Sequence, residues 1–223
     1  KIEKNLYNCK HYIRNNTEIV IKILRDNNFI KTSKTDDLQL ELSEKGIIAC
    51  NIQEINSLVF AELYEKTHGF QYVTWQSLIC LFSCFTNVTV NDDYKTYVVP
   101  NISYDFVTVM NEFKDISKKF SYIEEQEQVV ISEYDYHYEL IWYVSKWCNA
   151  ENESECHNVV KELQNDKQIF IGEFVKALMK INNIVSEVEK ICELLGNMEL
   201  MSKIKNIPEK TLKYVATCQS LYL

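Results

Sequence analysis

One uninterrupted amphipathic run, from Gly172 to Leu195, most constrains what this chain can fold into. It contains no proline, and its apolar residues recur every three or four positions, the spacing of one face of an α-helix. Those residues are Phe174, Leu178, Ile181, Val185, Val188 and Cys192. At about 1.5 Å per residue such a helix is roughly 36 Å long, about the diameter of a domain. The run therefore predicts one long helix with an apolar back against a core.

The opposite side of this helix is polar. At about 100° per residue, it carries Lys176, Lys180, Asn183, Glu187 and Lys190. Most charged stripes opposite an apolar stripe face water. Periodicity alone thus favours a solvated face and leaves its function open.

Turn-forming residues are scarce in this sequence. The 223 residues include four glycines and two prolines, several-fold fewer than average usage. Turns are therefore few and elements long, which favours an all-α fold. An apolar content of 46% is enough to build a core. The expected architecture is a helical bundle around a long central helix.

Helical periodicity recurs along the rest of the chain. Further helices are predicted over residues 2–25, 53–64, 75–85, 104–126, 139–147, 157–163 and 198–220. Thr74 is a suitable N-cap for the helix at 75–85, whose very apolar sequence predicts full burial. Residues 86–103 are expected to form a surface loop, and residues 148–155 a polar, acidic break. Pro208 is expected to kink or split the last helix.

A short strand is predicted before Gly46. Leu38, Leu40 and Leu42 alternate with polar residues, the period-two pattern of a half-buried strand. A helix, a polar turn and a short strand resemble the second half of a winged-helix unit. A helical hairpin with an extended connector explains the same pattern equally well.

Charge and composition restrict the possible function. A net charge of −8 argues against a broad electrostatic footprint for nucleic acid, although a narrow lysine stripe inside a channel is compatible with it. No stretch approaches the roughly 20 apolar residues of a membrane span, and no signal-peptide pattern opens the sequence. We therefore expect neither membrane insertion nor secretion. The first residue is Lys1 rather than Met, which suggests a processed chain or a piece of a longer one.

No motif for chemistry is visible. The sequence has no GxxxxGK[ST], GxGxxG, GxSxG or HExxH pattern. Its eight cysteines form no CxxC pair and its histidines no HxxxH pair, so we expect buried, reduced thiols in an intracellular protein without a metal site. Trp142 and Trp147 are expected in the core rather than on a base-stacking surface.

Several segments nevertheless resemble one family. Residues 45–52, KGIIACNI, are similar to the K-G-R-V-A-C-E-I motif that opens the C-terminal helical domain, called DSHCT, of the superkiller and exosome-associated DExH RNA helicases. The likeness continues through the following segments: Leu58 to Glu62, Leu81 to Phe85 (L-L-S-C-F in the family), Trp147, Gly172 to Val185, Leu195 to Leu200 (I-G-N-x-x-L) and the closing Ser220 to Leu223 (S-L-Y-L). It covers essentially residues 20–223 and implies that Leu223 is the natural C-terminus.

The resemblance implies two units. Residues 1–44 would be the second half of a winged-helix or linker unit, and residues 45–223 the DSHCT helical bundle. In this family, the bundle closes a ring around the 3′ single-stranded tail of the RNA. A long ratchet helix contacts the unwound strand, and the helix at 172–195 occupies its place.

The resemblance also implies four RNA-binding residues. Lys176 and Lys180 stand where the family has arginines, and Asn183 and Asn51 stand at family glutamates. Ile47 also replaces an arginine of the opening motif. Arginine stacks on bases and binds phosphate through two donors, whereas lysine offers a point charge. RNA contact is therefore expected to be weaker or differently tuned here.

Partners, cofactors and location follow from the same resemblance. It implies single-stranded RNA, a RecA-like helicase core in the same polypeptide, and the RNA exosome with its adaptor proteins, with no membrane and no DNA. ATP and Mg²⁺ would bind in the helicase core, so this chain alone should lack ATPase activity. The 195–200 segment is closer to the nuclear exosome helicase than to its cytoplasmic superkiller relative, which favours a nuclear location.

The alternative function is a helical protein-interaction scaffold that has lost RNA contact.

Overall fold

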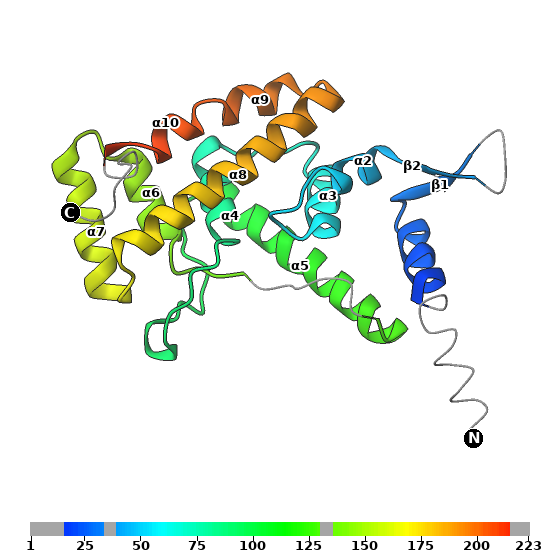
Figure 1. Ribbon diagram of the computed structural model, residues 1–223, viewed down its shortest axis with the longest axis horizontal. Coiled ribbons are helices and arrows are strands. Elements are labelled where there is room, and N and C mark those ends of the chain that lie inside the picture. Colours follow the sequence, from blue (N-terminus) through cyan, green and yellow to red (C-terminus); the bar gives the residue numbers. More distant parts are fainter. Residues whose placement is uncertain (1–15, 34–38, 130–135, 215–223) are drawn as a thin grey trace.

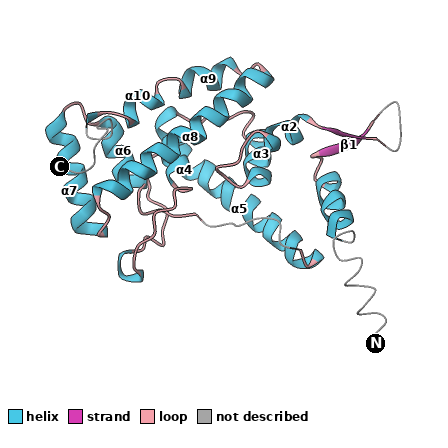
Figure 2. Cartoon of the chain, viewed as in Figure 1, coloured by secondary structure: helices cyan, strands magenta, loops and turns pink. Residues whose placement is uncertain are grey.

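The structure is a computed structural model, which describes residues 16–33, 39–129 and 136–214. Figure 1 shows a bundle of helices with a β-hairpin and a further helix at one side. The all-α prediction, with one short β segment, is confirmed (Figure 2). Part of the predicted first helix, strand position Leu38 and the closing Ser220 to Leu223 lie outside the described residues.

The elements follow one another along the chain with short connections. Residues 16–26 are helical and precede an antiparallel hairpin in which Ile30 lies opposite Leu42. The named elements are β1 (Ile30–Thr32), β2 (Leu40–Leu42), α2 (Glu44–Cys50), α3 (Ser57–Lys66), α4 (Trp75–Ser83), the 3-10 helix η1 (Asp92–Tyr94), α5 (Tyr104–Glu127), α6 (Ile141–Asn149), α7 (Glu153–Lys167), α8 (Ile171–Leu195), α9 (Met198–Ile204) and α10 (Ile207–Thr211).

Helix α4 is the innermost element. Thr74 caps it as predicted, because its side-chain oxygen accepts a hydrogen bond from the Ser77 N–H. Every residue from Ser77 to Ser83 is buried. The helix packs against α5, α6, α8 and α9 and so connects most of the bundle.

Helix α8 lies across α4 and also packs against α9 and α10 (Figure 1). All six residues of its predicted apolar stripe are buried. The Glu173 carboxylate accepts from the Phe170 N–H at the start, and Gly196 ends the helix in the left-handed conformation with φ 70°. Although α8 has 25 residues, neither it nor any other helix in the described ranges is long and apolar enough to cross a bilayer.

Two short helices hold the middle of α8 in place. The Trp147 indole N–H donates to the Thr211 carbonyl oxygen at 2.9 Å, and the Asn182 amide donates to Thr211 Oγ1 at 2.8 Å. Trp147 is fully buried and packs edge-on against Phe174. The core prediction is thus confirmed for Trp147 but wrong for Trp142, which is 50% exposed on the outer face of α6.

Other predictions differ from the structure. Helix α7 begins at Glu153, inside the predicted acidic break, because the Asn152 side chain caps it and acidic residues in its first turn favour a helix N-terminus. Helix α2 and strand β1 were not predicted. The strand at 40–42 is exposed rather than half-buried, because a two-stranded ribbon leaves its faces open.

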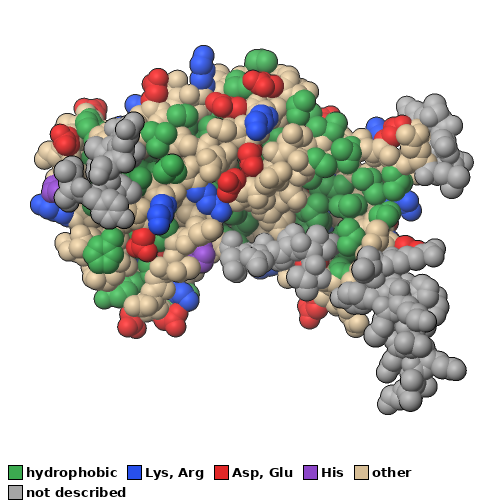
Figure 3. Space-filling view, in the orientation of Figure 1, with side chains coloured by type: hydrophobic (Ala, Val, Ile, Leu, Met, Phe, Trp, Pro, Cys, Tyr) green, Lys and Arg blue, Asp and Glu red, His purple; other side chains and the backbone are tan. Residues whose placement is uncertain are grey.

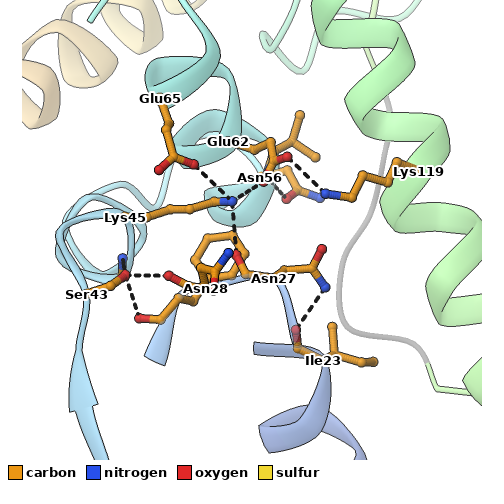
Figure 4. Close-up of polar contacts among 12 residues, drawn as sticks. Ile23, Asn27, Asn28, Ser43, Lys45, Asn56, Glu62, Glu65 and Lys119 are labelled. Atoms are coloured by element: carbon orange, nitrogen blue, oxygen red, sulfur yellow. Dashed lines mark hydrogen bonds and ion pairs between the residues drawn. The ribbon is translucent and has the colours of Figure 1, made fainter. Parts of the chain in front are cut away.

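A buried lysine connects the first segment of the chain to the bundle (Figure 4). The Lys45 ammonium, on α2, donates to the Asn27 carbonyl oxygen at 3.1 Å and pairs with the Glu62 carboxylate of α3. It also lies 4.6 Å from the centre of the Phe29 ring. Glu62 in turn accepts from Lys119 of α5 at 2.9 Å. The helix at 16–26, α2, α3 and α5 therefore meet at one polar cluster.

Gly46 permits this close approach. A Cβ built on Gly46 would collide with the Phe29 carbonyl oxygen. Only glycine therefore allows α2 to lie this close to the backbone that precedes β1.

Candidate nucleic-acid interface

The polar face of α8 points away from the core, as its sequence predicts. Lys176, Asn183 and Lys190 are exposed, while Lys180 and Glu187 are partly buried. Helix periodicity therefore places Lys176, Lys180 and Asn183 together on one face. These are three of the four residues expected to contact RNA.

This face is not solvated along its whole length, because the connection between α2 and α3 lies against it. The Glu54 carboxylate accepts a hydrogen bond from the Asn183 amide at 3.3 Å and lies 3.5 Å from the Lys180 ammonium. The Glu187 carboxylate accepts from the backbone N–H groups of Gln53 and Glu54, at 3.0 and 3.1 Å. Two of the predicted site residues therefore already have partners within the chain.

Lys180 also reaches the loop that follows α4. Its ammonium donates to the Asn87 side-chain oxygen at 3.0 Å. Two hollows meet at this pair: one of about 790 Å³ beside residues 49–57 and one of about 310 Å³ that also includes Lys176. The two hollows share Lys180 and Asn87 as lining residues, and we call the two together the groove; Lys176 lines the smaller one.

Asn51 lies apart from the other three predicted residues. It ends α2, and its amide donates to the Ile47 carbonyl oxygen at 2.8 Å. Its neighbours Cys50 and Ile52 line the larger hollow. Asn51 is therefore at the margin of the groove, with its amide donor bonded to its own helix.

Charges of both signs alternate along the groove. Glu54, Glu173 and Glu187 lie among the lysines of this face, and Figure 3 shows acidic and basic side chains interspersed rather than gathered. A phosphate chain bound here would therefore meet separate cations and not a continuous basic surface. RNA contact at this face stays a prediction.

Sequence reasoning missed Glu54 and Asn87. Glu54 lies where the sequence predicts a helix from residue 53, whereas α3 begins at Ser57, and Asn87 lies in a connection that has no periodicity. Each is far in the chain from Lys180. Neither residue has a motif that would identify it. Only the packing of α8 on these connections reveals their contacts.

The described residues offer no obvious centre for a metal or a nucleophile. No group of three or more His, Cys, Asp or Glu residues within the described ranges is arranged to hold a metal ion. Burial raises the pKa of the Cys80 thiol to about 12 and that of Cys192 to about 11, so both remain protonated at neutral pH. Five of the six described cysteines are buried; Cys50 is exposed, so the prediction of burial is wrong for it.

Comparison with known families gives one match. A family model described as the DSHCT (NUC185) domain matches residues 39–215. No curated protein sequence matches the chain.

Proposed function

This chain belongs to the DSHCT (NUC185) domain family, a helicase-associated C-terminal domain, and from that premise we propose that it guides single-stranded RNA leaving an ATP-dependent 3′–5′ RNA helicase. The RecA-like core of the same polypeptide would bind ATP and Mg²⁺. This chain would do no chemistry itself. ATP turnover by the purified 223-residue chain would contradict that division of labour.

The polar face of α8 is the observation that carries this proposal. It places Lys176 and Lys180 along one groove and Asn183 on the same face. Lysine ammonium groups attract phosphate as point charges, and amide groups offer both donors and acceptors to bases and sugars. A groove lined by separate cations suits sequence-independent contact with a single strand. Asn51 would act at its margin.

Reversing the two lysines tests the proposal. In the full-length protein, Lys176→Glu/Lys180→Glu should reduce RNA crosslinking to α8 and strand unwinding by about tenfold or more, because two phosphate contacts become repulsive. The matched control is Lys118→Glu/Lys161→Glu, which makes the same charge change at exposed positions on α5 and α7. Unaltered crosslinking and unwinding in the α8 variant would overturn the RNA-guiding role.

A protein-interaction scaffold is the second candidate function. The contacts of Glu54 with Lys180 and Asn183 favour it, because they leave fewer free groups for RNA. The net charge of −8 points the same way. Under this alternative, the α8 double variant would unwind RNA normally.

The remaining assignments belong to the same proposal. We place residues 1–44 in a winged-helix or linker unit and residues 45–223 in the DSHCT bundle. The RNA exosome and its adaptors are the proposed partner complex, and the nucleus is the proposed location. The likeness of residues 195–200 to the nuclear exosome helicase supports the last point.

A further inference from the structure

A separate hollow lies where α8 ends, and it shares no described lining residue with the groove. Its volume is about 390 Å³, and its walls come from α2, the end of α3 and the connection between α8 and α9. Ile48 and Leu195 supply its apolar lining. Leu194 and Met198, which adjoin lining residues in the chain, are 59% and 65% exposed. Large exposed apolar side chains beside a hollow are typical of a surface that binds another protein.

The rim of this hollow is acidic. Glu44, at the start of α2, is exposed and has no hydrogen bond or ion pair with a described residue. Glu65 is 64% exposed and lies 3.4 Å from the Lys45 ammonium, which Glu62 also neutralises (Figure 4). Among the described lining residues, Lys45 is the only lysine or arginine. The last turn of α8, residues 192–195, contains no basic residue to offset the negative end of the helix dipole. The rim therefore favours a cation.

Tyr64 offers a hydrogen-bond donor beside these carboxylates. It lines the hollow, is 7% exposed, and its hydroxyl oxygen accepts from the Asn197 amide at 2.8 Å. Its own hydrogen has no acceptor among the described residues. Burial raises the pKa of this phenol, so it stays protonated at neutral pH. Buried hydroxyl groups nearly always have hydrogen-bond partners, so this one suits an occupant that carries a carbonyl oxygen.

A left-handed turn forms one wall of the hollow and is held in place by its surroundings. His68, Gly69 and Phe70 have φ of 50°, 70° and 58°, values that are uncommon for residues other than glycine. The Lys203 ammonium donates to the Phe70 carbonyl oxygen at 3.0 Å, and the Phe70 side chain is fully buried. The wall is therefore formed before anything binds, which keeps the ordering cost of binding low.

We propose that this hollow binds an arginine of another protein, on a segment with an apolar residue at each side. A guanidinium group presents several donors in a plane and so reaches both Glu44 and Glu65, which a lysine ammonium matches less well. The Tyr64 hydroxyl donates to a backbone carbonyl oxygen of the segment. The flanking apolar side chains lie on Leu194 and Met198. This inference does not rest on RNA guidance, and its failure would leave that proposal unchanged.

A short synthetic peptide tests the proposal. The probe is a pentapeptide with blocked ends, in which one arginine stands between two leucines and a glycine lies at each end. In an NMR titration of the isotope-labelled 223-residue chain, it should shift the backbone amide signals of Gly69 and Asn197 in a saturable manner. Glutamate in place of the arginine should weaken binding at least about tenfold, because the rim then repels the peptide.

Neutralising the rim tests the role of its charges. Glu44→Gln/Glu65→Gln should weaken binding of the arginine peptide about fivefold, the size expected for two exposed ion pairs. The matched control is Glu125→Gln/Glu151→Gln, which neutralises two exposed carboxylates on other surfaces and should bind the peptide normally.

A second variant keeps the test valid if the first one fails to fold. Leu194→Gln/Met198→Gln changes exposed side chains away from the Lys45 cluster and should weaken peptide binding several-fold, because the flanking leucines lose apolar contacts. Met179→Gln, at another exposed position on α8, is its control and should keep the full affinity.

Three outcomes would contradict the proposal. Equal binding of the glutamate peptide would overturn the recognition of a cation. Unchanged affinity in both hollow variants, or signal shifts confined to other surfaces, would place the peptide elsewhere. Equal binding of a peptide with glycines in place of both leucines would overturn the assignment to a protein segment and indicate a site for a small cation.

Discussion

Lys45 shows how one buried charge fixes the position of several segments. Its side chain is 6% exposed, and removing an ammonium group from water costs several kcal/mol unless partners replace the lost hydration. Here the Glu62 carboxylate and the Asn27 carbonyl oxygen replace the lost hydration (Figure 4). The face of the Phe29 ring lies beside the same ammonium group. Because Asn27 and Phe29 lie on the segment before β1 and Glu62 lies on α3, the lysine stabilises the packing of these two segments against α2.

Replacing this lysine should therefore be costly. Lys45→Met should lower the free energy of unfolding by about 3 kcal/mol, because it leaves Glu62 partly buried with only Lys119 as a partner. Urea denaturation monitored by circular dichroism measures the change. Lys95→Met, which breaks the exposed pair with Asp92, is the control and should leave the free energy of unfolding nearly unchanged. Equal, small effects would show that the Lys45 cluster contributes no more than a surface pair.

The sequence predicted long elements better than short ones. The bounds of α4, α5 and α8 agree with their predicted ranges to within two residues, because periodicity over several turns is a strong local signal. Helix α2 has seven residues with Gly46 inside it, and β1 has three residues, so neither shows a full repeat. The start of α7 depends on the Asn152 cap, which lies inside a segment of ordinary loop composition.

The C-terminal end of α8 gives a prediction for a single element. Gly196→Ala should destabilise the protein by about 1–2 kcal/mol, because Gly196 has φ 70° and an L-residue is strained there. Thermal unfolding measures the loss.

Gly172 is the internal control for this change. It lies in the first turn of α8, and a Cβ added to it would meet no atom within 4 Å. Gly172→Ala should therefore leave stability unchanged or raise it by up to about 1 kcal/mol. A stabilising Gly196→Ala would contradict the proposed role of the left-handed cap.

At the scale of the whole molecule, the groove could not be predicted. The polar stripe of α8 was visible in the sequence, but Glu54 and Asn87 come from connections far from Lys180 in the chain. Ser117 lies on α5, and no sequence pattern distinguishes it from the other serines before its burial is known. Such contacts arise from tertiary packing between segments that are far apart in the chain, and local sequence patterns do not show which segments will meet.

Acid should weaken the whole fold through two carboxylates. Burial raises the pKa of Glu62, but hydrogen bonds from Lys45 and Lys119 outweigh it and hold that pKa below its ordinary 4.5. Burial also raises the pKa of Asp105, but hydrogen bonds to its carboxylate, including one from the Thr74 N–H, have the larger effect. They hold that pKa well below its ordinary 3.8. A pKa depressed by folding gives stability that is present above the ordinary value and lost as the pH falls through the folded one.

The free energy of unfolding should thus fall steadily below about pH 4.5. Urea titrations from neutral pH downward measure it. Asp105→Asn should make the decline shallower below about pH 4, because one of the proton-binding groups is gone. Glu125→Gln, at an exposed position on α5, should leave the slope unchanged. An identical acid slope in Asp105→Asn and the unaltered chain would show that Asp105 does not contribute.

The clamp at the middle of α8 has a mechanical consequence. Thr211 receives one hydrogen bond from Trp147 and one from Asn182, so α6, α8 and α10 are joined at a single buried point. Ten side chains of α8 are also packed in the core. A force applied along the outer face of this helix would therefore be resisted by its buried side chains as well as by its hydrogen bonds. We therefore expect α8 to move only together with the bundle.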